Sequence, residues 1–397
     1  MDLRDDARGI QDDLVNLRRQ LHRIPEVGLD IPRTQEMVLS ALAGLPLEIS
    51  TGSKTTSVIG VLRGDKPGPT VLLRGDMDAL PVIETLDIPY KSDNGNMHAC
   101  GHDLHTSMLV GAARVLSGHK DKMAGDVIFM FQPGEESYDG AGVMISEGVL
   151  EASGTAPSAA YALHVTSAVV PRGVFATRAG TVMAAADKMV VTVRGAGGHG
   201  SAPHRALDPI PAACEMVTAL QTFVTRSFDV FDPVVITVGA FHAGSAHNVI
   251  PETATFEATM RSFSETNHQR ILEECVRVIN GIAAAHRLEV DVEARSVYPV
   301  TVNDVGAVDL VNERVSEVFG DGGRFLELPF PLTGSEDFSR VLQAAPGAMI
   351  FLGAPAEGAD PLTAPFNHSP YAAFDDAVLA DGSALYADLA MHHLLAR

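Results

Sequence analysis

The chain has 397 residues, 46% of them hydrophobic, and this length and composition predict a globular protein with two domains or one large domain that carries an insertion. Its formal net charge of −21 argues against nucleic acids and anionic membrane surfaces as partners, and no apolar run is long enough to cross a bilayer. Three cysteines are too few for a disulfide framework, and the N-terminal segment lacks the features of a secretory signal, so we expect a cytoplasmic protein.

In chain order, the first expected element is an amphipathic helix, rich in charged residues, within residues 1–24. From residue 55 to about residue 180, short apolar runs typical of strands alternate with patterns typical of helices. Strands are expected over residues 56–62, 69–75, 126–132 and 159–165, and helices over residues 104–118 and 141–151. Strands that alternate with helices in this way favour a parallel α/β sheet.

The pattern changes near residue 185. Strands expected over residues 187–195, 233–243, 252–263 and 288–294 are longer, and several alternate apolar with polar residues, as in a half-exposed antiparallel sheet. With helices expected over residues 209–226 and 266–286, the element order is that of the ferredoxin-like split motif. A buried strand over residues 348–354 then returns to the first pattern. We therefore expect a discontinuous α/β domain of residues 1–183 and 297–397, interrupted by an α+β domain of residues 184–296.

Polar side chains follow several expected strands of the α/β domain. They are Asp76, Asp78, Glu135, Glu136, His164 and, after a loop, His368. Because open parallel sheets bind ligands beyond the carboxyl ends of their strands, we expect these side chains at one edge of the sheet. The segment MHACGHDLHTS adds Cys100 and His102 just before a helix. Thiolate, imidazole and carboxylate groups together form a ligand set for a borderline divalent ion such as Zn, Mn, Co or Ni.

Ten short motifs, in order along nearly the whole chain, carry a family resemblance. They are LRRQLHRIPEVG, RGDMDALPV, HACGHDLHTSMLVGAA, FQPGEES, ALHV, GAGGHGSAPH, HNVIPETA, MRSF, GSEDFS and FNHSP. Each motif alone is a weak signal, but the ordered set is specific. The chain resembles the metallopeptidase M20 family, and within it the amidohydrolase branch of hippurate hydrolases, bacterial N-acyl-amino-acid amidohydrolases and plant auxin-conjugate hydrolases.

The resemblance implies a fold and a ligand set. The fold would be a zinc-peptidase-like α/β catalytic domain with a mixed sheet, interrupted by a ferredoxin-like α+β domain that acts as a lid and dimerises. The implied metal ligands are Cys100, His102, Glu136, His164 and His368, which would hold two divalent ions per subunit, of Mn, Zn, Co or Ni. Such an ion pair would activate water and polarise the scissile carbonyl.

The resemblance also implies roles for four further residues. Glu135 would be the general base and then the general acid. His199, between glycines in GAGGHGSAPH, would reach into the active site of a partner subunit and stabilise the oxyanion. Asn248 and Arg261 would bind the substrate's α-carboxylate, for which a planar guanidinium is well suited. The protein would then be a homodimer, or a higher homo-oligomer.

Several alternatives remain open. Cys100 could be a nucleophile, since a thiolate beside histidine is activated, although the adjacent glutamates would then have no role. Asp76 is not a safe ligand, and Asp78 and His105 are better explained as groups that orient ligands. Arg261 could form an interface ion pair instead. Glu336 could have a direct role or could lie in a nearby loop whose Ser335 caps a helix.

Three functions are compatible with these residues. The first is a metal-dependent amidohydrolase that cleaves an N-acyl amino acid, such as a hippurate-like or N-acetyl compound, to a carboxylic acid and a free amino acid. The second is a carboxypeptidase or dipeptidase on the same scaffold, whose pocket should offer a carboxylate to a free ammonium group. The third is a metal-binding protein without activity, which loss of Glu135 or of a ligand would have signalled.

Overall fold

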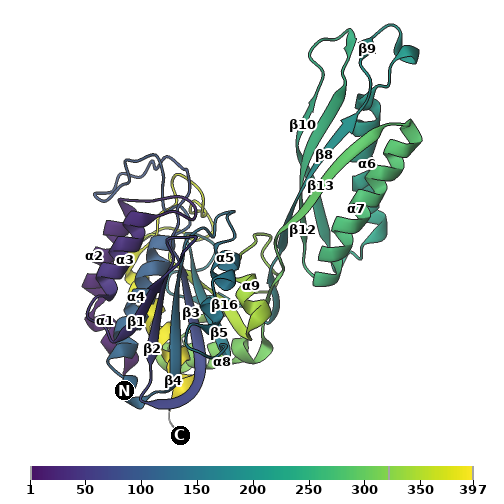
Figure 1. Cartoon of the computed structure of the whole chain (residues 1–397). Coiled ribbons are helices and arrows are strands. Elements are labelled where there is room, and N and C mark those ends of the chain that lie inside the picture. Colours follow the sequence, from purple (N-terminus) through teal and green to yellow (C-terminus); the bar gives the residue numbers. More distant parts are fainter. Residues whose placement is uncertain (1, 321, 396–397) are drawn as a thin grey trace. The chain divides into compact units, whose positions relative to one another are not determined.

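The computed structural model describes residues 2–320 and 322–395, and Figure 1 shows the whole ribbon. The described chain forms two compact units. Unit 1 contains the chain up to Val182, the segment Val302–Phe330 and the chain from Arg340 onward. Unit 2 contains Met183–Thr301 and Pro331–Ser339.

Unit 1 is built on an eight-stranded sheet with the strand order β1-β2-β4-β3-β5-β16-β6-β15. Its strands are β1 (Leu47–Thr51), β2 (Val58–Arg63), β3 (Lys66–Asp76), β4 (Ala124–Gln132), β5 (Ala159–Thr166), β6 (Phe175–Thr177), β15 (Phe325–Glu327) and β16 (Gly347–Gly353). The central strands β4, β3, β5 and β16 run parallel, whereas β1 and β2 pair antiparallel to their neighbours. Strand β6 pairs antiparallel to β16 and parallel to β15. The expected α/β fold with a mixed sheet is confirmed.

The antiparallel part of the sheet corrects the expectation of a parallel sheet from residue 55 onward. Only Gly64 and Asp65 separate β2 from β3. A link this short cannot cross over between parallel neighbours, since such a connection needs a dozen or more residues. The two strands therefore run antiparallel to each other, and β4 lies between them, antiparallel to β2 and parallel to β3. The apolar run of β3 from Val71 to Leu73 is buried, as expected for a strand at the centre of a sheet.

The helices of unit 1 are α1 (Leu3–Gly9), α2 (Gln11–His22), α3 (Pro32–Leu42), α4 (His102–Ser117), α5 (Gly140–Ser146), α8 (Val305–Phe319) and α10 (Leu379–Leu394), and α9 (Ser339–Ala344) begins at the boundary of the units. Short 3-10 turns cover Lys120–Lys122, Val149–Glu151 and Asp376–Val378. Helices α4 and α10 pack against β3 and against each other. Almost all of α4 is buried, so it forms the centre of the helical layer.

Two expected helices are interrupted. The single helix expected within residues 1–24 is divided at Ile10, directly after Gly9, where the poor helix propensity of glycine favours a break. The helix expected over residues 141–151 ends at Ser146, and Gly148 adopts a φ of +90°, which ends the helical path before a short 3-10 turn.

Unit 2 contains a four-stranded antiparallel sheet with the order β10-β12-β8-β13. Its elements are β8 (Ala185–Arg194), β9 (Gly198–His199), a 3-10 turn (Pro203–Arg205), α6 (Pro209–Ser227), β10 (Val234–Ala243), β11 (Val249–Ile250), β12 (Thr253–Ser262), α7 (Glu265–His286) and β13 (Glu289–Tyr298). Helices α6 and α7 pack on the sheet around an apolar core that includes Met189, Phe256 and Ile271. The short strands β9 and β11 form a separate ribbon.

Two short strands, β7 (Gly180–Met183) and β14 (Thr301–Asn303), pair where the chain passes between the units. Among the described residues, none of the helices combines the length and the apolar character that spanning a membrane requires.

Candidate metal centre

The carboxyl ends of β3, β4 and β5 deliver the polar side chains of unit 1 to one edge of the sheet. These strands are parallel neighbours, so Asp76 at the end of β3, the Glu135–Glu136 turn after β4 and His164 near the end of β5 come together. The two glutamates follow Gly134, whose φ of +73° turns the chain beyond the strand. The convergence inferred from the strand ends therefore occurs for these segments.

Cys100 and His102 flank a glycine that the local geometry requires. Gly101 has a φ of +83°, and a Cβ atom placed there would lie 2.3 Å from the side chain of Val165. The chain then enters α4 at His102, two residues earlier than expected. Cys100 consequently lies at the N-terminus of a 16-residue helix, where the helix dipole stabilises negative charge such as that of a thiolate.

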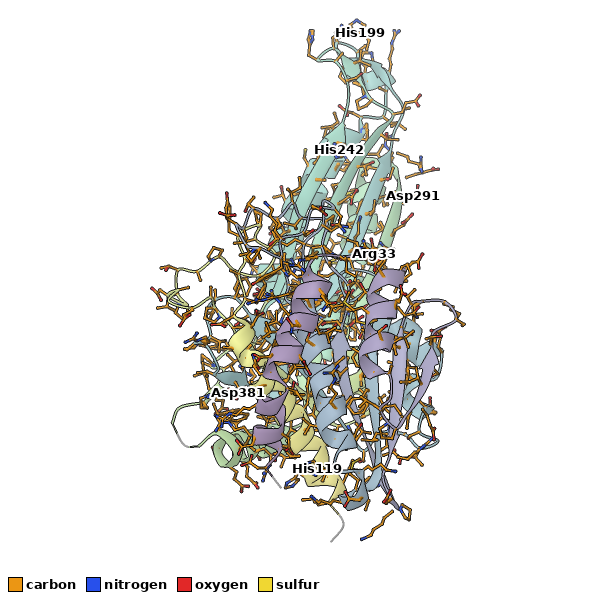
Figure 2. All side chains as sticks on the ribbon, turned by 90° about the vertical axis from the view of Figure 1, so that its left-hand side faces the viewer. Arg33, His119, His199, His242, Asp291 and Asp381 are labelled. Carbon is orange, nitrogen blue, oxygen red and sulfur yellow. The ribbon has the colours of Figure 1, made fainter. Side chains whose placement is uncertain are left out.

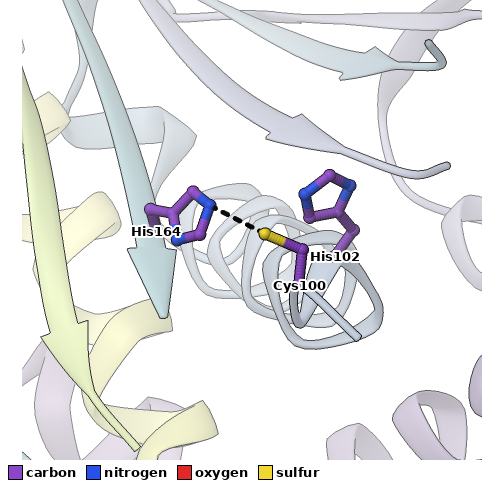
Figure 3. A group of neighbouring side chains, drawn as sticks. All are labelled: Cys100, His102 and His164. Atoms are coloured by element: carbon purple, nitrogen blue, oxygen red, sulfur yellow. Dashed lines mark hydrogen bonds between the residues drawn. The ribbon is translucent and has the colours of Figure 1, made fainter. Parts of the chain in front are cut away.

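Two groups of candidate ligands share Cys100. In the first, one ligand atom each from Cys100, His102 and His164 lies within 4.8 Å of the others, and the Sγ atom of Cys100 is 3.4 Å from Nε2 of His164 (Figure 3). In the second, Cys100, Glu136 and His368 are equally close, and Nε2 of His368 is 3.1 Å from Oε1 of Glu136. The other four side chains named as ligands from the sequence thus all lie close to the Cys100 sulfur.

The two adjacent glutamates are held by Asp78. The backbone N–H of Glu135 donates to Oδ1 of Asp78 at 3.0 Å, and the N–H of Glu136 donates to Oδ2 at 3.1 Å. Glu135 is buried, and a carboxylate oxygen from each glutamate lies within 4.8 Å of a ring nitrogen of His102. With both Asp78 oxygens engaged by backbone N–H groups, Asp78 fixes the turn that carries Glu135 and Glu136.

The donor set fits a divalent ion, and the polar atoms of His102 give the clearest sign of this. His102 is 1% exposed, yet neither ring nitrogen makes a well-formed hydrogen bond: Nδ1 is 3.5 Å from Asp78 and Nε2 is 3.6 Å from Asp76. A buried imidazole whose nitrogens lack well-formed hydrogen bonds is costly unless another group satisfies them. A cation bound by the ring would do so, and the neighbouring thiolate and carboxylates would compensate its charge.

The electrostatics of the site also favour the binding of a cation. Contact with Cys100 and Glu136 raises the pKa of His368 to about 10, so a proton is held where these two anions face the imidazole. Burial alone raises the pKa of the Cys100 thiol, but the positive field of His164 outweighs it and places that pKa well below its ordinary value. The centre therefore favours the thiolate and attracts positive charge.

His105 cannot serve as a ligand in this arrangement because both of its ring nitrogens are engaged. Nδ1 lies 2.5 Å from Oδ1 of Asp76, and Nε2 accepts the backbone N–H of Val165 at 2.7 Å. This pattern places the ring proton on Nδ1, and burial lowers the pKa of His105 to about 4, so the imidazole is neutral. Arg74 Nη1 donates to the other oxygen of Asp76 at 2.6 Å, which keeps Asp76 ionised.

The remaining residues predicted from the sequence lie in unit 2, at two separate places. His199 pairs with Val249 in the β9–β11 ribbon, and Gly200 donates its N–H to the carbonyl of Asn248, so His199 and Asn248 are neighbours. Figure 2 labels His199 at the exposed end of this unit. Ser201 donates its backbone N–H to Nδ1 of His199, so a neutral ring would carry its proton on Nε2.

Arg261 lies at the opposite end of the unit 2 sheet. The ribbon adjoins the end of β12 at Thr253, whereas Arg261 is eight residues farther along that strand, a separation of roughly 25–30 Å. Arg261 is half-buried and donates from Nη1 to Oγ of Ser335 at 3.0 Å. Ser335 does not cap a helix, since α9 begins only at Ser339, and Glu336 accepts the backbone N–H of Phe338.

Three residues of unit 1 that lie around the centre were not predicted from the sequence. Arg74 and Gln132 are buried on β3 and β4, with Nε of Arg74 donating to Oε1 of Gln132 at 2.9 Å. The polar residues within otherwise apolar strand runs, VLLRG and FMFQ, were the available signal. Asn367, next to His368, contacts Cys100 and the end of β5, and no spacing rule could have indicated this.

A comparison with protein families finds a match to the model of peptidase family M20/M25/M40 over residues 72–392. Two similar relatives cover nearly the full chain. Thermostable carboxypeptidase 2 of Saccharolobus solfataricus is 38% identical over 98% of this chain and 97% of its own. Hippurate hydrolase of Campylobacter jejuni is 35% identical over 99% of this chain and 100% of its own.

The fold is also similar to solved structures. The crystal structure of a protein of Bacillus subtilis described as a dinuclear metal-binding peptidase of the M20 family is 28% identical, with a TM-score of 0.81. The similarity covers 98% of this chain and 99% of that chain.

Proposed function

Because the chain belongs to peptidase family M20/M25/M40, we propose that it is a metal-dependent amidohydrolase that cleaves N-acyl amino acids to a carboxylic acid and a free amino acid. The observation that carries this proposal is the convergence of Cys100, His102, Glu136, His164 and His368 beside a buried Glu135. A relative named hippurate hydrolase, which spans the same length, supports the choice of an N-acyl amino acid.

Two divalent ions, of Mn, Zn, Co or Ni, are the proposed cofactors, as in the relative described as dinuclear. His102, His164 and Cys100 would hold one ion, and Glu136, His368 and the same Cys100 would hold the other. When bound, such ions lower the pKa of water and polarise the carbonyl of the substrate.

Glu135 is the proposed proton carrier. Its backbone is fixed by Asp78, and its carboxylate is close to His102 and Glu136 without being needed as a ligand. It would take a proton from the attacking water and deliver it to the nitrogen of the leaving amino acid as the C–N bond breaks. Water supplies the hydroxyl group of the new carboxylic acid and the hydrogen of the new amine, so the reaction is balanced without a further reactant.

The inserted region, residues 184–296, is the proposed lid and dimerisation domain, with a ferredoxin-like arrangement of its strands and helices. His199 and Asn248 lie roughly 25–30 Å from Arg261, so one protomer cannot direct all three at the same substrate. In a homodimer, His199 and Asn248 would serve the partner's site while Arg261 serves its own. His199 would donate from Nε2 to the oxyanion, and Arg261 with Asn248 would bind the α-carboxylate.

A second candidate is a carboxypeptidase, which the similarity to thermostable carboxypeptidase 2 favours. Both activities break an amide whose nitrogen belongs to an amino acid with a free α-carboxylate. They differ only on the acyl side, where a short peptide can present an ammonium group and an N-acyl compound presents none.

The test is amino-acid release by protein stripped of metal and reloaded with Mn, Zn, Co or Ni. The panel pairs N-acetyl, N-benzoyl and long-chain N-acyl amino acids with dipeptides of the same C-terminal residue, and adds the α-carboxamide of each compound. We expect metal-dependent release of the amino acid from the N-acyl acids, and slower release of the amino-acid amide from the carboxamides. Release from dipeptides alone would show that the protein is a peptidase. No release from any compound, although an ion is bound, would overturn the proposed hydrolase function.

A further inference from the structure

The side chain of Asn367 joins three segments that carry the proposed ligands. Its Nδ2 donates to the carbonyl of Val165 at 3.0 Å and to the carbonyl of Cys100 at 3.3 Å, and lies 3.7 Å from Sγ of Cys100. Its Oδ1 accepts the backbone N–H of Ser167 at 2.9 Å and faces the Ser167 hydroxyl at 3.1 Å. Every polar atom of this amide is therefore engaged.

One of these acceptors also orients a proposed ligand. The carbonyl of Val165 accepts Nδ1–H of His164 at 2.9 Å as well as Nδ2–H of Asn367. With Nδ1 donating to this carbonyl, His164 directs Nε2 at Sγ of Cys100, 3.4 Å away. By holding this carbonyl, Asn367 helps to fix both the tautomer and the direction of His164.

Asn367 also precedes a strained ligand. His368 has a φ of +71°, a conformation that is unfavourable for a non-glycine residue and persists only where its surroundings impose it. The backbone N–H of His368 donates to the carbonyl of Ala99 at 2.8 Å. Together with the Asn367 side chain, this bond ties the His368 loop to the loop of Cys100.

We propose that Asn367 is a positioning residue that donates an N–H to the Cys100 thiolate and holds Cys100, His164 and His368 in one arrangement for metal binding. The inference rests on the ligand roles in the proposed function. An N–H donor beside a thiolate lowers the energy of the sulfur lone pairs and so changes how strongly the sulfur donates to an ion. A residue with only a structural role would not do this.

The test uses the full-length protein loaded with Co²⁺, because a cobalt–thiolate bond gives a charge-transfer absorption band. Asn367→Asp keeps the size of the side chain and its acceptor for Ser167 but replaces the donor with a carboxylate. Asn367→Ala removes the side chain. We expect the band to move to longer wavelength in both variants, farther in Asn367→Asp, and metal affinity to fall roughly 10- to 100-fold.

Asn303→Asp is the matched control. Asn303 is a buried asparagine whose Nδ2 donates to Thr177 and to the carbonyls of Arg178 and Met349, so this variant should melt at a lower temperature with an unchanged band. Loss of cobalt binding in an Asn367 variant that melts no lower than the control also supports the proposal.

Two other outcomes separate this inference from the proposed function. An unchanged band and affinity in both Asn367 variants would overturn the role of Asn367 and leave the ligand set intact. A wild-type protein that binds cobalt without a thiolate band would remove Cys100 from the ligand set, and this inference would fail with it.

Discussion

The Nε2 atom of His105 accepts the backbone N–H of Val165, the residue that follows the proposed ligand His164. The same imidazole faces Asp76, so the end of β5 is tied through His105 to the end of β3. His105 thus supports a ligand without binding an ion itself.

We predict that His105→Phe weakens metal binding by roughly 10- to 100-fold, because it removes the acceptor for Val165 N–H and leaves Asp76 without its imidazole partner. The affinity would be measured by competition with a chromophoric chelator. His119→Phe is the control, since His119 contacts Asp6 at the surface, away from the centre. Equal affinities in the two variants would contradict the supporting role of His105.

Glu135→Gln should lower kcat by roughly 10²- to 10⁴-fold while leaving metal content unchanged, because the amide cannot accept a proton from water. Glu136→Gln should instead release metal, since it removes a proposed ligand. Activity and metal content would be measured on the same samples. Comparable turnover in wild type and Glu135→Gln would remove Glu135 from the mechanism.

Mixing two inactive variants tests whether His199 acts across a dimer. Glu135→Gln and His199→Ala each damage every site in their own homodimers. In a mixed dimer, one site combines an intact Glu135 with an intact His199 from the partner. After subunit exchange at equal amounts, about a quarter of the wild-type rate should return, since half of the dimers are mixed and each has one intact site. No recovery, despite proven exchange, would place His199 at its own protomer's site.

The stability of unit 2 should depend on pH through His268. A hydrogen bond to Asp187, whose Oδ1 is 2.8 Å from Nε2 of His268, raises the pKa of His268 above its ordinary value of about 6.5. The stabilisation of unit 2 by the His268–Asp187 pair is therefore complete below about pH 6.5, and it is lost as the pH rises through the raised pKa of His268. His268→Gln should cost about 1.5–3 kcal/mol of unfolding free energy at pH 6 and less at pH 9.

The control for this prediction is His286→Gln, which removes a half-buried histidine of α7, the helix that also carries His268. His286 contacts Glu215 of α6. Denaturant titrations of both variants and of wild type would be compared at the two pH values. A cost for His268→Gln that is the same at pH 6 and pH 9 would show that the buried pair does not titrate.

The strands and helices of both units could be predicted from hydrophobic periodicity, because most of them bury one face or both. Their pairing could not. The position of β4 between β2 and β3 depends on which strand finds which partner, and the chain gives no local sign of it. The break at Ile10 was also missed, because one glycine in a helical pattern does not show whether packing will tolerate it.

The residues of the candidate site likewise include some that local sequence features predicted and some that they did not. The grouping of Asp76, the glutamate pair and His164 followed from strand ends, which are local features. His368 was also expected at this edge, but it follows β16 only after a long loop, and its role as a ligand came from the family resemblance. Asn367 bonds to Ser167 and Cys100, each at least 200 residues away in sequence, and such contacts exist only after the fold has formed.

Both backbone groups of Val165 are hydrogen-bonded. Its N–H donates to His105, and its carbonyl accepts from Asn367 and His164. Protein groups alone make these bonds, so we expect the ligands to keep their arrangement when a chelator removes the ions. Reloading would then require no refolding. Because thiolate, imidazole and carboxylate ligands accept several divalent ions, we expect the supply of ions at loading to decide largely which of them the protein holds.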